Sequence, residues 1–366
     1  MQRKFFRHNL IKSELSISDI IKSIMSKTIY FLGAGASAGK RNDQGLILEG
    51  LPIVSEIPDR FDFFREYISN VNIPDGDINF WDRFLTNSDN VERNKEDMLN
   101  DIDFLIQGIQ SHATIDTYAR KLYLTGNEKG FETLKDVLCT FFIWEQIVNN
   151  PDNRYDTFLA NILDMPYLNI PRDISILSWN YDSQIEMAFR SYRERPGLIV
   201  YEKNRESKWP ELSDTGRIIK LNGSATFVDS PIVTSILADK RLPVELQLII
   251  IYSHIKSSLS GLGIHFKTHL SFAWEDSPNQ ENMLNTIKAT TEDTEYVVVV
   301  GYSFPFFNRQ TDRLIFGGMQ RLRKIYVQDM NADAVIQSMK AVLPADLHVD
   351  IEPITKCDQF YLPGEL

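Results

Sequence analysis

The chain contains only two cysteines in 366 residues, Cys139 and Cys357. This scarcity excludes a disulfide framework and a zinc site held by four thiolates. No apolar run approaches the length of roughly 20 residues that a membrane-spanning helix needs. The basic start of the chain, residues 1–8, lacks the apolar core of a signal peptide. We therefore expect a cytoplasmic protein that holds no metal ion.

An excess of positive charge is also missing. Lys and Arg number 39 against 50 Asp and Glu, which gives a net charge of −11. Such a balance argues against a protein whose main task is binding the phosphate backbone of nucleic acids. The hydrophobic content of 43% and the charged content of 24% are ordinary for a globular protein, and the length suits one large domain or two smaller ones.

The most informative segment begins at Thr28. Residues 28–32 are mostly β-branched or aromatic and lead directly into Gly33, Ala34, Gly35, Ala36 and Ser37. This pattern predicts a buried strand followed by a tight turn, whose backbone amides can hold a pyrophosphate. A third glycine, Gly39, comes one residue later than in the usual dinucleotide fingerprint, so a purely structural turn is the alternative interpretation.

The periodicity of apolar residues divides the rest of the chain into a helical part and an alternating part. Helical spacing predicts helices at 16–26, 60–69, 79–86, 97–124, 130–149 and 154–163, and later at 183–193, 279–292, 308–322 and 332–342. Apolar runs predict strands at 173–179, 198–201, 217–221, 268–273, 295–301, 324–328 and 347–353. We therefore predict an α/β fold: a doubly wound, mostly parallel, Rossmann-like sheet from residues 1–57 and 166–366, with a helical insertion at 58–165.

Small and hydrogen-bonding residues follow several of the predicted strands. Because ligands of open parallel sheets bind beyond the carboxyl ends of the strands, these positions are candidates for a site. They are 33–37, then Asn180, Tyr181 and Asp182, then Asn222, Gly223 and Ser224, then Gly301, Tyr302 and Ser303, and finally Gln328, Asp329 and Asn331. Each group alone could be a helix cap or a turn. Together they predict a nucleotide-binding crevice.

Four of these motifs, GAGAS, WNYD, KLNGS and GYS, occur in an order that resembles the sirtuin-type NAD-binding domain. The chain looks closest to the divergent sirtuin-like proteins of bacterial anti-phage defence, which hydrolyse NAD⁺ and do not deacylate proteins. The likeness extends from residue 28 to about residue 331, with the helical insertion where that family carries its own. It implies NAD as the substrate and an NAD⁺ hydrolase as the enzyme.

The resemblance also implies a role for each motif. Asn180 matches the asparagine that orders the nicotinamide ribose and the attacking water, and Asp182 is its companion acid. The other implied contacts with NAD are made by Gly33, Ala34, Gly35, Ala36 and Ser37 at the pyrophosphate, by Gly223 and Ser224 beside Asn222, by Gly301, Tyr302 and Ser303 at the adenosine ribose, and by Gln328 and Asp329 at the adenosine end. Cleavage of the nicotinamide bond develops an oxocarbenium ion, so the site must seat the ribose, stabilise positive charge and deliver water.

Two departures from the family pattern matter. Protein deacylases of this family hold zinc on four cysteines, which this chain does not have. Where the family usually has a histidine, this chain has Asn222, whose amide cannot take up a proton near neutral pH. Asn222 could still orient a ribose hydroxyl as a catalytic residue, or a histidine from elsewhere could act as the base; the candidates are His112, His265 and His269. In the insertion, Asp116 is either a helix cap or a further contact with the ribose.

Three functions are consistent with these residues. The first is an NAD⁺ glycohydrolase that depletes NAD⁺ in infected bacteria. The second is a nucleotide-sensing subunit without turnover, which Asn222 favours. The third, a dehydrogenase, lacks an acid about 20 residues after the glycines in a second strand. A toxic hydrolase must be restrained, so we expect a homo-oligomer, a separate sensor, ATPase or other nucleotide-handling partner, or both. The basic arm at residues 3–7 either contacts a neighbouring subunit or is a disordered tail. We expect no membrane binding and no direct nucleic-acid binding.

Overall fold

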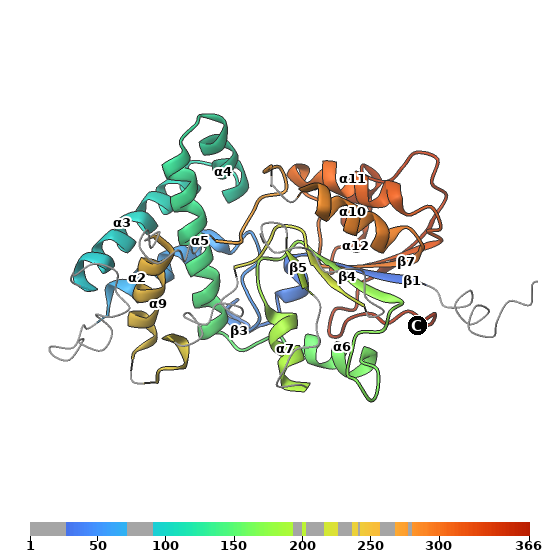
Figure 1. Cartoon of the computed structure of the whole chain (residues 1–366), viewed down its shortest axis with the longest axis horizontal. Helices are drawn as coiled ribbons and strands as arrows, with labels where there is room; N and C mark the ends of the chain where they lie inside the picture. Colours follow the sequence, from blue (N-terminus) through green and yellow to red (C-terminus); the bar gives the residue numbers. More distant parts are fainter. Residues whose placement is uncertain are drawn as a thin grey trace, which may run out of the picture.

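The computed structural model describes residues 27–71, 91–192, 200–202, 216–225, 236–240, 242–256, 268–276 and 280–366. The helices predicted at 16–26 and 79–86, the basic arm and His265 lie outside these ranges. The described residues form a sheet with helices on both faces and, beyond one end of its strands, a separate layer of helices (Figure 1).

In the part of the chain that the structure describes, the central sheet has seven strands, and all neighbouring strands are parallel. The strands are β1 (Lys27–Leu32), β4 (Ile174–Ser178), β5 (Val200–Glu202), β6 (Ile218–Lys220), β7 (Thr294–Val300), β8 (Lys324–Gln328) and β9 (Asp350–Ile354), in the order β5-β6-β4-β1-β7-β8-β9. A separate hairpin pairs β2 (Lys40–Arg41) with β3 (Ile47–Glu49). Because the chain extends the sheet on one side of β1 and then on the other, β1 and β7 flank the topological switch point. The predicted doubly wound α/β fold is confirmed.

Side chains of β1 alternate between the two faces of the sheet. Ile29 and Phe31 belong to one core with α10 (Gln280–Thr291), α11 (Arg309–Gly318) and α12 (Ala332–Lys340). Tyr30 and Leu32 belong to the core on the opposite face, with α6 (Arg154–Ile162) and α7 (Gln184–Tyr192). A strand has a side-chain period of two, so a strand covered on both faces is apolar throughout. This explains the unbroken apolar runs in the sequence.

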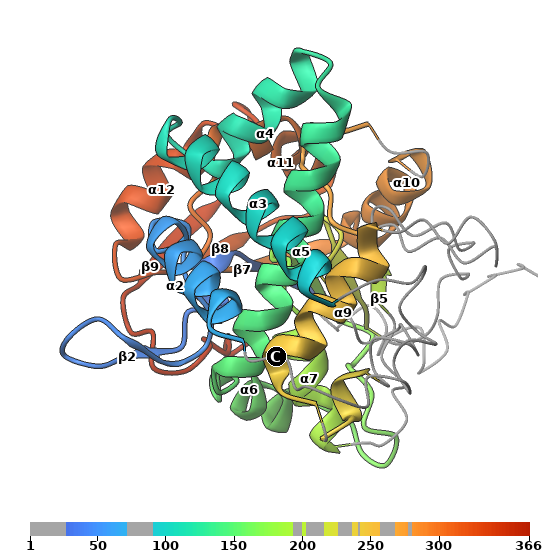
Figure 2. The same cartoon turned by 90° about the vertical axis from the view of Figure 1, so that its left-hand side faces the viewer.

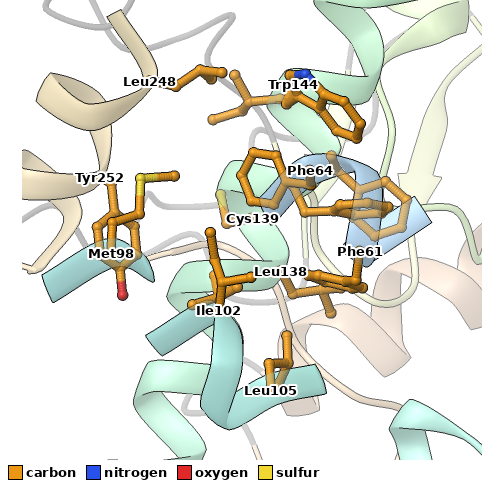
Figure 3. Packing of buried hydrophobic residues seen from close by; sticks show 14 of the residues in the cluster. Phe61, Phe64, Met98, Ile102, Leu105, Leu138, Cys139, Trp144, Leu248 and Tyr252 are labelled. Atoms are coloured by element: carbon orange, nitrogen blue, oxygen red, sulfur yellow. The ribbon is translucent and has the colours of Figure 1, made fainter. Parts of the chain in front are cut away.

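The helical layer has its own core. Among the described residues the layer contains α2 (Ile57–Ser69), α3 (Val91–Gln110), α4 (Ile115–Leu124), α5 (Glu128–Val148) and α9 (Val244–Lys256), which face the viewer in Figure 2. Figure 3 shows Phe61 and Phe64 of α2 beside Leu138 and Trp144 of α5, with Tyr252 of α9 on the far side. The ring of Phe61 stacks on that of Phe141, with centroids 4.2 Å apart.

The helical layer does not coincide with residues 58–165. Helix α6 packs with α7 under the sheet, whereas α9, which the sequence analysis did not propose as a helix, packs on α3 and α5. The layer is therefore built from two stretches of chain separated by part of the sheet. No helix among the described residues combines the length and apolarity that crossing a bilayer requires.

Two predicted elements were wrong. The helix predicted at 97–124 is divided into α3 and α4, because Thr114 begins α4 by accepting a hydrogen bond from the Thr117 amide. The strand predicted at 268–273 is irregular. Its aromatic residue Phe272 packs on Phe131 in the helical layer, so its apolar character comes from that core and not from a sheet. The sequence analysis also did not propose the short hairpin of β2 and β3. The other differences among the predicted elements are shifts at the ends of helices and strands.

Phe61→Ala should lower the free energy of unfolding by about 3–5 kcal/mol, because it leaves a cavity against Phe141 in a fully buried core. Urea denaturation measures the change. Phe63 lies on the same helix and is 52% exposed, so Phe63→Ala is the matched control and should change stability by less than about 0.5 kcal/mol. Equal losses in the two variants would contradict the packing of this core.

Candidate active site

Two adjoining hollows lie between the carboxyl ends of the strands and the helical layer. The outer cleft, about 1120 Å³, is lined by the loop after β1, the start of α2, residues 109–115 and the loops after β7 and β8. The inner pocket, about 150 Å³, is lined by the loops after β1, β4, β6 and β7 and by the start of α4. The two hollows share Ala34, Val54, Ile57, Ile115, Gly301 and Ser303.

Most of the predicted site residues line one of these hollows. The inner pocket is lined by Gly33, Ala34, Ser37, Asp116, Asn180, Asp182, Asn222, Gly301, Tyr302 and Ser303, and the outer cleft by Ala34, Gly35, Gly301, Ser303, Gln328 and Asp329. Ala36, Gly223 and Ser224 line neither hollow, so the structure does not bring them to the site.

The glycines of the loop after β1 are needed for contact with the loop after β7. A Cβ on Gly33 would lie 2.6 Å from the Gly301 carbonyl oxygen, and a Cβ on Gly35 would lie 2.7 Å from the Gly301 Cα. The amide of Gly35 donates to the Gly301 carbonyl oxygen, at 2.9 Å. Among the described residues the Ala34 amide finds no acceptor, so it is the donor that this loop can offer to a ligand in the hollows.

Arg154, which was not among the predicted site residues, also stabilises the loop after β1. Its guanidinium donates to the carbonyl oxygens of Gly35 and Ala36, at 3.0 and 3.2 Å, and pairs with Asp152. It also stacks on Phe360 and lines the outer cleft. A buried arginine with these partners fixes the geometry of the loop. No motif in the sequence connects Arg154 with the glycines.

Asn180 is held by the loop after β1. Its side-chain nitrogen donates to the Ser37 hydroxyl oxygen at 3.1 Å, and this hydroxyl is 2.9 Å from that of Tyr155. All three residues are buried. Ser37 therefore positions Asn180 through its side chain, and we expect the amide oxygen of Asn180 to face the inner pocket.

Asn222 carries a buried oxygen without a partner. Its side-chain nitrogen donates to the Trp179 carbonyl oxygen at 3.3 Å, while its Oδ1 meets no donor among the described residues. A buried, unsatisfied amide oxygen costs about 1–3 kcal/mol. A ligand hydroxyl or amide in the inner pocket would satisfy it. Gly223 follows with φ +65°, and a Cβ there would overlap the His269 carbonyl oxygen, so its role is structural.

Asp182 is engaged in local structure. One of its carboxylate oxygens accepts the Gln184 amide at 3.0 Å at the start of α7. Its carbonyl oxygen accepts a hydrogen bond from Lys220, which is buried beside Glu186, 3.4 Å away. The arrangement ties the loops after β4 and β6 together at the inner pocket.

Asp116 reaches the inner pocket from the helical layer. It lies in the first turn of α4, where the helix dipole favours a negative charge. Burial raises the pKa of its carboxyl group to about 6, although a hydrogen bond from its own backbone amide acts to lower this pKa. Burial and then the charge of Asp116 raise the pKa of Tyr181, a neighbour in the same pocket.

A buried polar cluster lies beneath the pocket. The carboxylate of Asp312 accepts hydrogen bonds from the Tyr302 hydroxyl at 2.9 Å and from the Trp179 indole at 3.1 Å, and Asn308 donates to Tyr302. The ring of Tyr302 packs on Trp179 with centroids 6.0 Å apart. The hydroxyl of Tyr302 is therefore committed to this cluster. Burial raises the pKa of Asp312 to about 7.

Gln328 uses its side chain to hold the C-terminal segment. Its nitrogen donates to the carbonyl oxygens of Lys356 and Gln359, both at 2.6 Å, and its oxygen accepts the Tyr361 amide. These bonds favour a structural role over the predicted contact with adenosine. Asp329 lines the outer cleft, with one oxygen accepting the Asn331 amide at 2.8 Å.

Neither described histidine candidate lines the inner pocket. His112 lines the outer cleft, where its ring lies 2.7 Å from the Gly108 carbonyl oxygen and 3.3 Å from the Lys121 nitrogen. His269 lines neither hollow. Within the described residues no three His, Cys, Asp or Glu side chains gather as a metal-holding group would.

No protein-family model and no curated protein matches this chain. The likeness to sirtuin-type domains therefore depends on the four motifs and their order.

Gly301→Ala should lower the free energy of unfolding by at least about 2 kcal/mol. Its φ is +57°, and a Cβ there would lie 2.4 Å from the Gly35 backbone. Gly317→Ala is the control, because a Cβ at this position of α11 meets nothing within 4 Å and alanine favours a helix. Thermal denaturation of both variants measures the contrast. If Gly301→Ala were as stable as the control, the close contact of the loops would be wrong.

The raised pKa of Asp312 predicts a pH dependence of stability. The folded state holds this proton more tightly than the unfolded chain, so the contribution of Asp312 falls as the pH rises from about 4 to about 7. As the pH rises from 5 to 7, the free energy of unfolding of the wild type should therefore fall more steeply than that of Asp312→Asn. The difference between the two slopes should be roughly 1 kcal/mol per pH unit. Urea denaturation across this range measures the difference. Parallel curves for the two proteins would contradict the assignment.

Proposed function

We propose that this protein is an NAD⁺ glycohydrolase, which cleaves NAD⁺ to nicotinamide and ADP-ribose. The observation that carries the proposal is the pair Asn180 and Asn222 in one narrow pocket, with the Asn222 Oδ1 buried and unsatisfied. The wide outer cleft adjoins this pocket along the glycine loop at the switch point of the sheet. A ligand with a reactive end and a long second half fits two hollows of such unequal size.

In this proposal the nicotinamide ribose occupies the inner pocket and the ADP part extends through the outer cleft. Asn222 accepts a hydrogen bond from a ribose hydroxyl, and Asn180 orders the ribose and the attacking water. The Ala34 amide binds a phosphate oxygen, and the carboxylate of Asp329 reaches the adenosine end. The chemistry requires a fixed ribose and an environment that stabilises the oxocarbenium ion as it forms.

The second candidate is a nucleotide-binding subunit without turnover. It is favoured by the lining of the inner pocket, which contains no histidine among the described residues and has Asn222 where sirtuin-type domains usually have one. Such a protein would bind NAD⁺ in the same hollows and report its presence to an assembly.

We extend the first candidate to the setting that the resemblance implies. The hydrolase would act in the cytoplasm of phage-infected bacteria and deplete their NAD⁺, held inactive until needed by a homo-oligomer or by a separate sensor or ATPase protein. Activity should then depend on assembly or on that partner.

The decisive measurement is the release of nicotinamide from NAD⁺ by the purified protein, alone and with the product of the adjacent gene. Asn180→Ala and Asn222→Ala should each reduce kcat by at least about 100-fold, because both residues act on the reacting ribose. Asn222→His should retain activity. Asn161→Ala is the control, since Asn161 lies on the exposed surface of α6.

Three outcomes separate the candidates. Activity that depends on both asparagines and survives EDTA supports the metal-free hydrolase. NAD⁺ that protects the protein from heat denaturation without being cleaved, under any of these conditions, supports the sensor. If the protein is active and neither Asn180→Ala nor Asn222→Ala changes kcat, the catalytic site lies elsewhere.

A further inference from the structure

Asp116 enters the inner pocket from a different layer than the other polar residues. Asn180 and Asn222 follow strands of the sheet, whereas Asp116 belongs to α4 of the helical layer. The carboxylate of Asp116 therefore reaches the pocket from the helical layer and not from the sheet.

The helix does not need this carboxylate as a cap. Thr114 already caps α4, since its hydroxyl oxygen accepts the Thr117 amide at 3.2 Å. Apart from the backbone amide of Asp116 itself, no described residue donates a hydrogen bond to the Asp116 carboxylate or pairs with it. Asp182, the other carboxylate in the lining of the pocket, accepts the Gln184 amide. Asp116 is thus the acid that the described part of the pocket leaves available to a ligand.

The surroundings of Asp116 suit proton transfer. Burial raises the pKa of its carboxyl group to about 6, near the range in which a general base works best. The titratable groups that line the pocket with it are Tyr181, Asp182 and Tyr302. Helix α5 contributes the uncharged Phe142, while Lys135 of that helix pairs with Glu275. On the side of the outer cleft, His112 and Lys121 lie beside one another.

We propose that Asp116 is a catalytic residue whose carboxylate accepts the proton of the attacking water. This inference rests on the proposed hydrolysis of NAD⁺. The bond between the ribose C1′ and the nicotinamide nitrogen breaks, and its electron pair passes to the ring nitrogen, which leaves as neutral nicotinamide. The water oxygen bonds to C1′, its proton passes to Asp116 and then to solvent, and the charge of the carboxylate stabilises the oxocarbenium ion on the way.

The test combines kcat, NAD⁺ binding and the pH profile of Asp116→Asn. The wild type should lose activity below about pH 6, when Asp116 is protonated. Asp116→Asn should reduce kcat by at least about 100-fold and lose this limb of the profile, while NAD⁺ still raises its melting temperature. Asp116→Glu, which keeps the acid, should recover part of kcat with a shifted limb. Asp97→Asn, an exposed acid on α3, is the control and should match the wild type.

Two results would overturn the inference although the enzyme is active. One is an Asp116→Asn protein with kcat within about threefold of the wild type and the same acidic limb. The other is a variant that loses only NAD⁺ affinity and reaches full kcat at saturation, which would make Asp116 a binding residue. A wild-type protein that releases no nicotinamide under any condition would refute the proposed function and the inference together, so the two failures are distinguishable.

Discussion

The contact between two glycine loops is the constraint on which the rest of the site depends. The loops after β1 and β7 meet backbone to backbone at the switch point, at distances that leave no room for a Cβ on either side. Because Gly301 lies against Gly35, the loop after β1 is held in one position, and hydrogen bonds from Arg154 hold it as well. Ser37 can then orient Asn180. Residues of both loops line the outer cleft and the inner pocket, so the contact fixes one edge of each hollow.

Few of the polar groups at the two hollows remain available to a ligand. Several predicted contacts are used within the protein: the Ser37 hydroxyl binds Asn180, the Tyr302 hydroxyl binds Asp312, and the Gln328 amide binds the C-terminal segment. These bonds preorganise the site, but they occupy polar groups that could otherwise bind a ligand directly. Among the described residues, the groups that remain for a ligand include the Ala34 amide, the side-chain oxygens of Asn180 and Asn222, and the carboxylates of Asp116 and Asp329. Specificity for a ligand must come from the geometry of that small set.

The sequence predicted the sheet well and the packing between its layers poorly. Strands buried on both faces leave unbroken apolar runs, so β1, β4, β7 and β8 were predictable, as were the polar residues at their ends. Helix α9 was missed because residues 246–252 are all buried and show no helical period. The glycine pattern was clear, but a sequence cannot tell whether the space above a glycine is filled by a phosphate or by another loop. Arg154 and Asp312 act through tertiary contacts that no spacing reveals.

The return of α9 to the helical layer has a consequence for the order in which the protein can fold. The Tyr252 hydroxyl donates to Asp101 across 151 residues of sequence, and α9 fills the side of the core between α3 and α5. During synthesis α2 to α5 leave the ribosome long before α9 exists, so their shared apolar surface stays open to water while much of the sheet is made. Loop closure over such a separation is slow, and exposed apolar surface promotes aggregation. We therefore expect the nascent chain to be most prone to aggregation between the emergence of α5 and that of α9.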